Sequence, residues 1–360
     1  MDREARIDAG RVIVSIDLRA GRVASATVRS ERPRGLATLF VGRAPDAVPD
    51  LARRLFALCG LSQATAARHA LRAAGAALAG PAPDAERDAL AAERLAEHLR
   101  ATVIDWSGAV PLAAAERAAV PAALSALAGT AVDAAALGPA LAALGLAGGA
   151  SAEWVAGSWA GRLLGFARTA LPRLAAGWPD PLSAADDAAV LAALDRDGDA
   201  FAAQPGLPGR APQTGPAARA ALGGAPATQP AARLAARLAE IAAAAAHLSG
   251  VRPLDATPVT AGRLDTGTGF AAVETPRGRL HHLAALDRSD RVARYLILAP
   301  TEWNFAAGGP CAAALAGIEI GPGDPSGTIR RLASLFDPCV ECRVEVRGTA
   351  GGADDRQEGS

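Results

Sequence analysis

Hydrophobic and polar positions alternate near the N-terminus of the chain. Apolar residues occupy every second position from Val12 to Leu18, and after a turn at Ala20-Gly21 the alternation resumes and reaches Val28. A period of two places successive side chains on opposite faces of a strand. The pattern therefore predicts a β-hairpin over residues 11–30.

From about Asp46 onward, Leu and Ala recur every three or four residues, which is the spacing of one helix face. We expect helices over residues 62–79, 84–99, 111–127, 131–147, 151–175, 182–195 and 231–248. Strand-like sequence returns at residues 269–273, 279–286 and 291–298. The pattern predicts an α+β fold that is predominantly helical, with β-rich N- and C-terminal parts flanking a helical core and the two ends of the chain brought together.

Two segments depart from these periodic patterns. Residues 204–230 are dense in Pro and Gly, and their composition alone does not decide between a linker and a structured crossing. Residues 347–360 are small and polar, which predicts a disordered tail.

Charge and composition remove several classes of protein. The chain has 37 basic and 37 acidic residues, so it lacks the basic excess typical of a nucleic-acid binder. Every basic residue other than His is Arg, which excludes a P-loop lysine or an internal Schiff-base amine. No apolar run approaches the roughly 20 residues that span a bilayer, and the first residues do not resemble a signal peptide. We expect a cytoplasmic protein that neither inserts into a membrane nor binds nucleic acid.

The four cysteines are the main candidates for chemistry. Cys339 and Cys342 form a CxxC pair, Cys59 precedes the expected helix 62–79, and Cys311 stands apart. The spacing of the pair suits a shared metal or a strained disulfide, and it also arises without function. The dipole and the free N–H groups of the following helix are expected to lower the pKa of Cys59 and to favour a metal-bound thiolate.

Several motifs together resemble the large subunit of nickel–iron hydrogenases. Leu58-Cys59-Gly60-Leu61-Ser62 resembles the N-terminal CGxC of that family, and residues 337–342 (DPCVEC) match its C-terminal DPCxxC. Further matches lie in the family's order: residues 34–36 (RGL) with 42–46 (GRAPD), 214–219 (TGPAAR), 274–278 (ETPRG) and 299–304 (APTEWN). The resemblance implies a large-subunit-like fold in a single domain over residues 1–346, with parts at 1–45, 46–250 and 251–346.

The resemblance also implies a set of site residues. In that family, the two cysteine motifs hold a nickel–iron centre whose iron carries CO and cyanide. The matching metal ligands here are Cys59, Cys339 and Cys342. The residues implied around the diatomic ligands are Arg277, Pro300, Thr301 and Asp337. Arg277 and Thr301 would donate hydrogen bonds to cyanide, and Pro300 would help to keep the pocket dry.

Departures from the motifs argue against a working hydrogenase. Ser62 replaces the second cysteine of CGxC, and a neutral hydroxyl is a poor ligand for a thiolate-preferring centre. Ala37 and Glu345 replace the two residues that belong to a buried magnesium site in the family, so no magnesium site is expected. A nickel–iron centre would lack one thiolate, and nickel is therefore not expected either.

This combination of retained and lost residues resembles the HupK/HoxV-type hydrogenase accessory proteins. That resemblance implies a non-catalytic scaffold that transiently holds iron with CO and cyanide ligands before delivery. The implied partners are maturation proteins of the HypC/HypD type and the precursor of the hydrogenase large subunit. Two alternatives remain open: a metal-free mimic of the large subunit that binds maturation factors, and a degenerate hydrogenase with residual oxidoreductase activity.

The remaining polar candidates are interpreted as structural. His281 and His282 are adjacent on an expected strand and therefore face opposite sides, which disfavours joint metal ligation. Residues 195–199 (DRDGD) resemble an incomplete calcium loop and are better explained as a solvated helix end. Cys311 matches no ligand position, and we expect a small buried side chain there.

Overall fold

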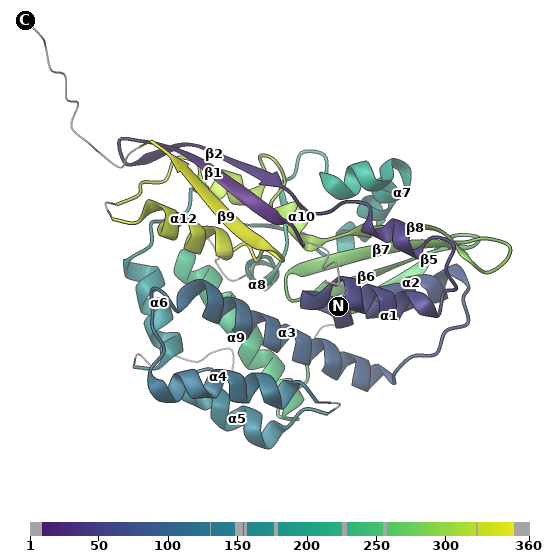
Figure 1. Cartoon of the computed structure of the whole chain (residues 1–360), viewed down its shortest axis with the longest axis horizontal. Helices are drawn as coiled ribbons and strands as arrows, with labels where there is room; N and C mark the ends of the chain where they lie inside the picture. The colour runs from purple at the N-terminus through teal and green to yellow at the C-terminus, as the bar shows by residue number, and fades with distance from the viewer. Residues whose placement is uncertain are drawn as a thin grey trace, which may run out of the picture.

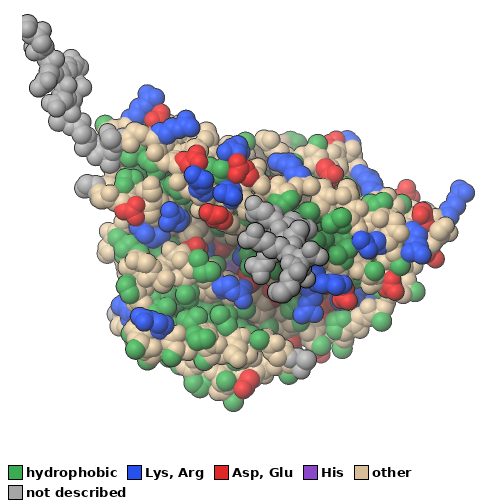
Figure 2. Space-filling model, in the orientation of Figure 1, with side chains coloured by type: hydrophobic (Ala, Val, Ile, Leu, Met, Phe, Trp, Pro, Cys, Tyr) green, Lys and Arg blue, Asp and Glu red, His purple; other side chains and the backbone are tan. Residues whose placement is uncertain are grey.

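The chain folds into a helical body, a three-stranded sheet at its edge and a separate four-stranded sheet (Figure 1). The computed structural model describes residues 9–129, 131–147, 154, 157–175, 179–224, 229–254, 258–321 and 323–348. In the described part of the chain, no helix is both long and apolar enough to cross a membrane. Arg and acidic side chains are interspersed over the face seen in Figure 2.

The three-stranded sheet joins the two ends of the described chain. Strands β1 (Arg11–Arg19) and β2 (Arg22–Ser30) form the expected antiparallel hairpin. Strand β9 (Glu341–Arg347) pairs in parallel with β1, with Val14 opposite Val344. The hydrophobic pattern of this segment did not predict β9. Arg347 ends this strand, so the expected tail starts too early, and residues 349–360 lie outside the described residues.

The four-stranded sheet has helices on both faces. Its antiparallel strands follow chain order: β5 (Val259–Asp265), β6 (Thr268–Thr275), β7 (Gly278–Leu286) and β8 (Val292–Leu298). Three of them confirm the expected strands, whereas β5 was not expected. Helix α2 (Gly60–Ala74) covers one face, and α7 (Asp187–Ala203) covers the other.

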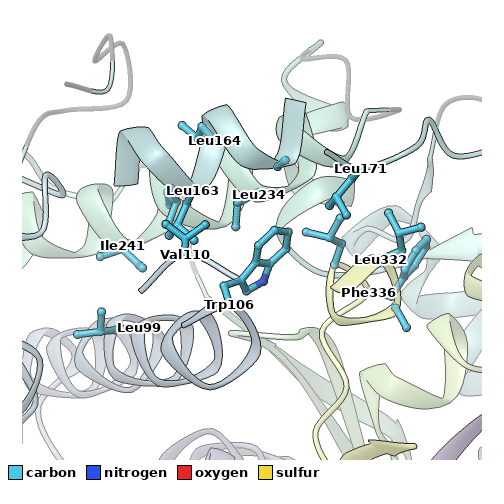
Figure 3. Close-up of a cluster of buried hydrophobic side chains, with 14 of the residues drawn as sticks. Leu99, Trp106, Val110, Leu163, Leu164, Leu171, Leu234, Ile241, Leu332 and Phe336 are labelled. Carbon is cyan, nitrogen blue, oxygen red and sulfur yellow. The ribbon is translucent and has the colours of Figure 1, made fainter. Parts of the chain in front are cut away.

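The helical body surrounds a large apolar core (Figure 3). Trp106 lies at its centre, fully buried among Leu and Ile side chains from α3, α6 and α9 and Phe336 near the C-terminus. The helices that build this body are α3 (Pro83–Trp106), α4 (Ala114–Leu127), α5 (Ala134–Ala143), α6 (Trp159–Thr169), α9 (Pro230–Leu248), α11 (Pro310–Leu315) and α12 (Pro325–Ser334). With aromatics at only 4%, the core depends on close Ala and Leu packing between helices.

The expected helices are present, but several have other bounds: α2 ends at Ala74 instead of residue 79, and α3 continues to Trp106 beyond residue 99. Of the helix expected over 151–175, the structure has α6 at Trp159–Thr169, while residues 151–153 and 155–156 lie outside the described residues. The helix expected to end at residue 195 continues to Ala203 through a kink at Gly198, whose φ is 57°. Residues 195–199 therefore lie inside this element and do not form a helix end.

The Pro/Gly-rich stretch is a structured crossing. It contains the short strand β4 (Pro212–Gln213) and helix α8 (Pro216–Leu222), and the backbone between them is buried. Residues 225–228 lie outside the described part of the chain. Three short elements complete the path around the site: α1 (Ala47–Leu55), the 3-10 turn η2 (Ala57–Cys59) and α10 (Pro300–Asn304).

Candidate functional site

A cavity of about 560 Å³ lies where the N-terminal and C-terminal parts of the chain meet. Five residues expected at the site line it: Cys59, Arg277, Pro300, Thr301 and Cys339. They come from the end of η2, the turn between β6 and β7, the start of α10 and the loop before β9. Apolar side chains, including Leu55, Phe56 and Leu280, supply most of the remaining surface.

Two hydrogen-bond donors in this cavity are buried without a partner in the described part of the chain. Arg277 donates from Nε to the Pro338 carbonyl and from Nη2 to Glu97, each over 3.2 Å, but its Nη1 has no acceptor. The hydroxyl of Thr301 is also unpartnered, and this residue is only 1% exposed. An unsatisfied buried polar group costs about 1–3 kcal/mol, so a ligand with acceptor atoms that reached both groups would remove this cost.

The sequence motifs converge behind the cavity through one amide side chain. Asn304 of α10 accepts a hydrogen bond from the Thr214 N–H and donates to the carbonyls of Thr214 and Phe336. Three segments that are far apart in sequence are thereby fixed together, and Phe336 directly precedes the DPCVEC motif. This contact explains how the Pro/Gly-rich crossing, α10 and the C-terminal cysteine loop come to share one site.

Asp337 and Cys342 lie outside this cavity. Asp337 has a positive φ of 54° and pairs with the buried Arg237 at 2.9 Å, beside a separate void of about 10 Å³. Cys342 sits on β9 opposite Val12, packed against the main core. The structure thus brings together two of the three expected cysteines and places Asp337 where it anchors the loop. Among the described residues, no group of three or more His, Cys, Asp or Glu side chains could hold a metal ion.

The N-terminus of α2 is already occupied by a carboxylate, which the sequence analysis missed. Glu93 of α3 accepts hydrogen bonds from the Leu61 N–H at 2.7 Å, from the Ser62 N–H at 3.0 Å and from the Ser62 hydroxyl. Ser62 is buried and does not line the cavity. The side chain that replaces a cysteine is thus part of a helix cap.

The expectation that the helix lowers the pKa of Cys59 is wrong. Burial raises the pKa of Cys59 to about 12, and the negative charge of Glu93 adds to this effect. The free N–H groups that would have stabilised a thiolate are bonded to Glu93 instead. In the protein alone, Cys59 is a neutral thiol at neutral pH.

A buried chain of polar side chains orients one wall of the cavity. Gln63 Nε2 lies 3.8 Å from the Cys59 sulfur, and Gln63 Oε1 lies 2.8 Å from His282 Nε2. His282 Nδ1 in turn lies 2.7 Å from the Tyr295 hydroxyl. The Nε2–H tautomer of His282 satisfies all three hydrogen bonds. In this tautomer Nε2–H donates to Gln63 Oε1, the Tyr295 hydroxyl donates to Nδ1, and the amide N–H₂ of Gln63 is directed at the Cys59 sulfur.

The two adjacent histidines face opposite sides of the sheet, as expected. His281 contacts Asp187 at the start of α7 over 2.9 Å, while His282 contacts Gln63 of α2. Arg279 also pairs with Asp187 and with Glu274, and Glu274 pairs with Arg219 at 3.0 Å. These buried ion pairs fix the turn that presents Arg277 to the cavity.

Arg32 is a second site residue that the sequence analysis missed. It follows the first hairpin, lines the cavity together with both cysteines, and pairs with Glu302 of α10. Glu302 directly follows Thr301 in the APTEWN segment, and this acidic residue within the motif was the signal that the sequence offered. The expected buried position of Cys311 is confirmed, since its side chain is fully buried in the main core.

Comparison with known proteins gives a consistent group of relatives. Residues 201–345 match the family model described as nickel-dependent hydrogenase. The chain is 36% identical over 366 residues to the hydrogenase expression/formation protein HupK of Rhizobium leguminosarum bv. viciae, covering 96% of this chain and 98% of the relative. It is 34% identical to HupK of Bradyrhizobium diazoefficiens, over 93% of this chain and 96% of the relative. The protein HoxV of Cupriavidus necator is 30% identical, over 90% of this chain and 94% of the relative.

Solved structures support the same fold. A chain of the Ni-Fe-Se hydrogenase of D. vulgaris Hildenborough superposes with a TM-score of 0.54, over 91% of this chain and 98% of that chain, at 15% identity. At this identity the likeness concerns the fold alone. It confirms the expected large-subunit-like architecture, with β-rich ends around a helical core.

Proposed function

The chain belongs to the family of hydrogenase expression/formation proteins that includes HupK and HoxV, and from this premise we propose that it serves nickel–iron hydrogenase maturation as a non-catalytic carrier. Its cargo is an iron fragment with CO and cyanide ligands, held in the cavity and then passed to the hydrogenase large subunit. Its partners are maturation proteins of the HypC/HypD type and the large-subunit precursor, all in the cytoplasm.

The observation that carries this proposal is the pair of unpartnered donors. Arg277 Nη1 and the Thr301 hydroxyl are both buried at one cavity that also contains two cysteine thiols. Cyanide bound to iron presents a nitrogen that accepts hydrogen bonds, so two such ligands would satisfy both donors. Pro300 and the apolar walls would exclude water from the cargo.

The number of thiols at the cavity supports the role of a carrier over that of the hydrogenase large subunit, which is the final acceptor of the iron fragment. Cys59 and Cys339 line the cavity, whereas Cys342 lies outside it on β9, opposite Val12. Fewer thiolates give weaker binding, and each 1.4 kcal/mol of difference in affinity favours transfer about tenfold. The same count disfavours hydrogenase activity, because Ser62 is bonded to Glu93 and does not line the cavity.

The first test is an infrared spectrum of the protein purified without oxygen from a host that expresses the maturation proteins, paired with iron and nickel analysis. We expect CO and cyanide stretches with iron and without nickel. Cys339→Ser should lose these stretches and abolish hydrogenase maturation in the host. Cys311→Ala is the matched control, since this cysteine is buried away from the cavity and should leave both intact.

One observation favours the metal-free mimic as a second candidate. No described group of three or more potential ligands is arranged for a metal, and Cys59 is a neutral thiol. If the protein is a metal-free mimic, its infrared spectrum should show no CO or cyanide stretches, even in a host that lacks the hydrogenase large subunit. Cys339→Ser should then leave hydrogenase maturation normal. That pair of results would overturn the carrier proposal.

A further inference from the structure

The cavity presents positive charge to whatever occupies it. Three guanidinium groups line it, those of Arg32, Arg54 and Arg277, and none of the described lining residues carries a carboxylate. The carboxylates that pair with two of these arginines lie elsewhere. Glu97 lines two other cavities, one of which it shares with Arg277, and Glu302 lines a smaller cavity of about 90 Å³.

Arg32 is held at the boundary between two cavities. Its guanidinium donates from Nη1 to Glu302, and both side chains are only 15% exposed. Arg32 lines both the main cavity and the smaller one, whereas Glu302 lines only the smaller one. The carboxylate therefore holds the guanidinium from the side of the smaller cavity, while Arg32 also lines the main cavity together with both cysteines.

The electrostatic surroundings of Arg32 agree with this arrangement. Burial by itself lowers the pKa of Arg32, but the charges that Cys339, Glu302 and Cys59 carry when they are ionised outweigh burial, and the net pKa is raised. The side chain is thus charged at any physiological pH, and it lies close enough to both cysteines to interact with them. Arg54 is more exposed and donates to a backbone carbonyl of its own helix, which makes it the weaker candidate.

We propose that Arg32, positioned by Glu302, is a ligand-recognition residue of this cavity and makes the cavity select anionic over neutral ligands near Cys339 and Cys59. The inference deepens the proposed function, because it assigns the ligand class of the same site. It predicts that a negatively charged molecule enters the cavity and reacts there more readily than an uncharged molecule of the same shape. This preference should disappear when the charge of Arg32 is removed.

The test compares two thiol reagents of nearly equal size, iodoacetate and iodoacetamide, on the purified full-length protein. Both react with the thiolate, so the ratio of their rates cancels the thiolate fraction and reports the local potential. Peptide mapping by mass spectrometry gives the ratio separately for Cys59, Cys339 and Cys342. Arg32→Gln should lower the iodoacetate-to-iodoacetamide ratio at Cys339 by about fivefold, since one nearby charge is lost in a partly buried site.

Three controls keep the experiment decisive. Arg34→Gln removes the same charge two residues away, from an exposed side chain outside the main cavity, and should change the ratio less than twofold. Arg32→Lys keeps the charge and should retain the ratio. Cys342 lies outside the cavity and serves as the internal reference, with an unchanged ratio in every variant.

An unchanged ratio at Cys339 in Arg32→Gln would overturn the inference, as would an equal fall at Cys342. Neither result bears on the infrared test, because the alkylation uses protein without cargo. Conversely, the alkylation ratios could show the expected charge preference while the infrared spectrum shows no CO or cyanide stretches. That result would support the role of Arg32 and contradict the proposed iron cargo.

Discussion

At the scale of single residues, local hydrogen bonds and ion pairs occupy positions where this chain departs from the hydrogenase motifs. Ser62 and Glu93 form a cap on α2, so the position of a lost thiolate is filled by a hydrogen-bonded hydroxyl and carboxylate. The same carboxylate raises the pKa of Cys59, after the larger effect of burial. Glu302, in turn, provides the acceptor for Arg32. Each contact is local: one bonds the Ser62 hydroxyl at the start of α2, and the other holds the Arg32 guanidinium at the cavity.

One buried histidine makes stability depend on pH in a predictable direction. Burial lowers the pKa of His282 from 6.5 to about 3, with the charge of His281 as the second cause. As pH falls from 6.5 toward 3, the unfolded chain binds a proton at this position that the folded chain does not bind. The contribution of neutral His282 to the free energy of unfolding is therefore complete above pH 6.5 and decreases below it.

Replacement of His282 with Gln removes this titration. As pH falls from 6.5 to 5, the difference in slope of the free energy of unfolding between the wild type and this variant should rise toward about 1.4 kcal/mol per pH unit, the value for one proton. Urea unfolding at a series of pH values measures both slopes. Equal slopes in the two proteins would contradict the assigned protonation state.

At the scale of elements, the β6–β7 turn depends on a close approach that only glycine permits. Gly278 has φ 123°, and a Cβ at this position would overlap the Thr214 hydroxyl and lie 2.7 Å from the Gly215 nitrogen. Thr214 accepts a hydrogen bond from the Arg279 N–H at 2.8 Å, which fixes the crossing segment against the turn. Arg277 is presented to the cavity by this contact between two elements.

Gly278→Ala should therefore lower the free energy of unfolding by about 3–5 kcal/mol, because it adds both backbone strain and a steric overlap. Gly138→Ala, inside α5 with open space around the added carbon, is the matched control. That control should be neutral or stabilising by up to about 1 kcal/mol, as alanine favours a helix. Urea unfolding compares the two variants, and similar stabilities would refute the role of this turn.

At the scale of the whole molecule, the cavity exists because distant parts of the chain are joined. Arg32 and Cys59 come from the first sixth of the chain, while Thr301 and Cys339 come from the last. The parallel pairing of β1 with β9 connects these parts, since β9 begins directly after the cysteine loop. A change that destabilises this sheet should therefore also displace Cys339 from its position at the cavity.

Strand β9 offers a matched pair of variants for this coupling. Val344 and Val346 pack against the main core, whereas Arg343 and Glu345 alternate with them on the other face. Val344→Asp combined with Val346→Asp should lower the free energy of unfolding by about 2–4 kcal/mol and accelerate alkylation of Cys339 by iodoacetamide.

The control is Arg343→Ser combined with Glu345→Ser, which should change stability by less than about 1 kcal/mol. Urea unfolding and mass-spectrometric alkylation rates are measured on both double variants. A destabilised protein with an unchanged Cys339 rate would show that the sheet and the cysteine loop are independent.

The sequence by itself determined those helices and strands whose hydrophobic residues recur with a clear period. It also determined the family to which the chain belongs. Alternation gave the first hairpin, helical spacing gave most of the helices, and the cysteine, ETPRG and TEWN motifs indicated the fold and five residues of the cavity. These features are local or lie in short motifs, so residue order alone carries them. Opposite orientations of His281 and His282 also followed from strand geometry.

Only the tertiary structure decided the electrostatics of the site and which residues line the cavity. Glu93 approaches Cys59 from another helix, so the raised pKa of that thiol could not be derived from its neighbours in sequence. Cys342 is three residues from Cys339, yet strand pairing directs it away from the cavity, and Arg32 enters from a distant segment. Desolvation, strand register and charge pairing depend on which segments pack together, and that packing is a property of the folded chain.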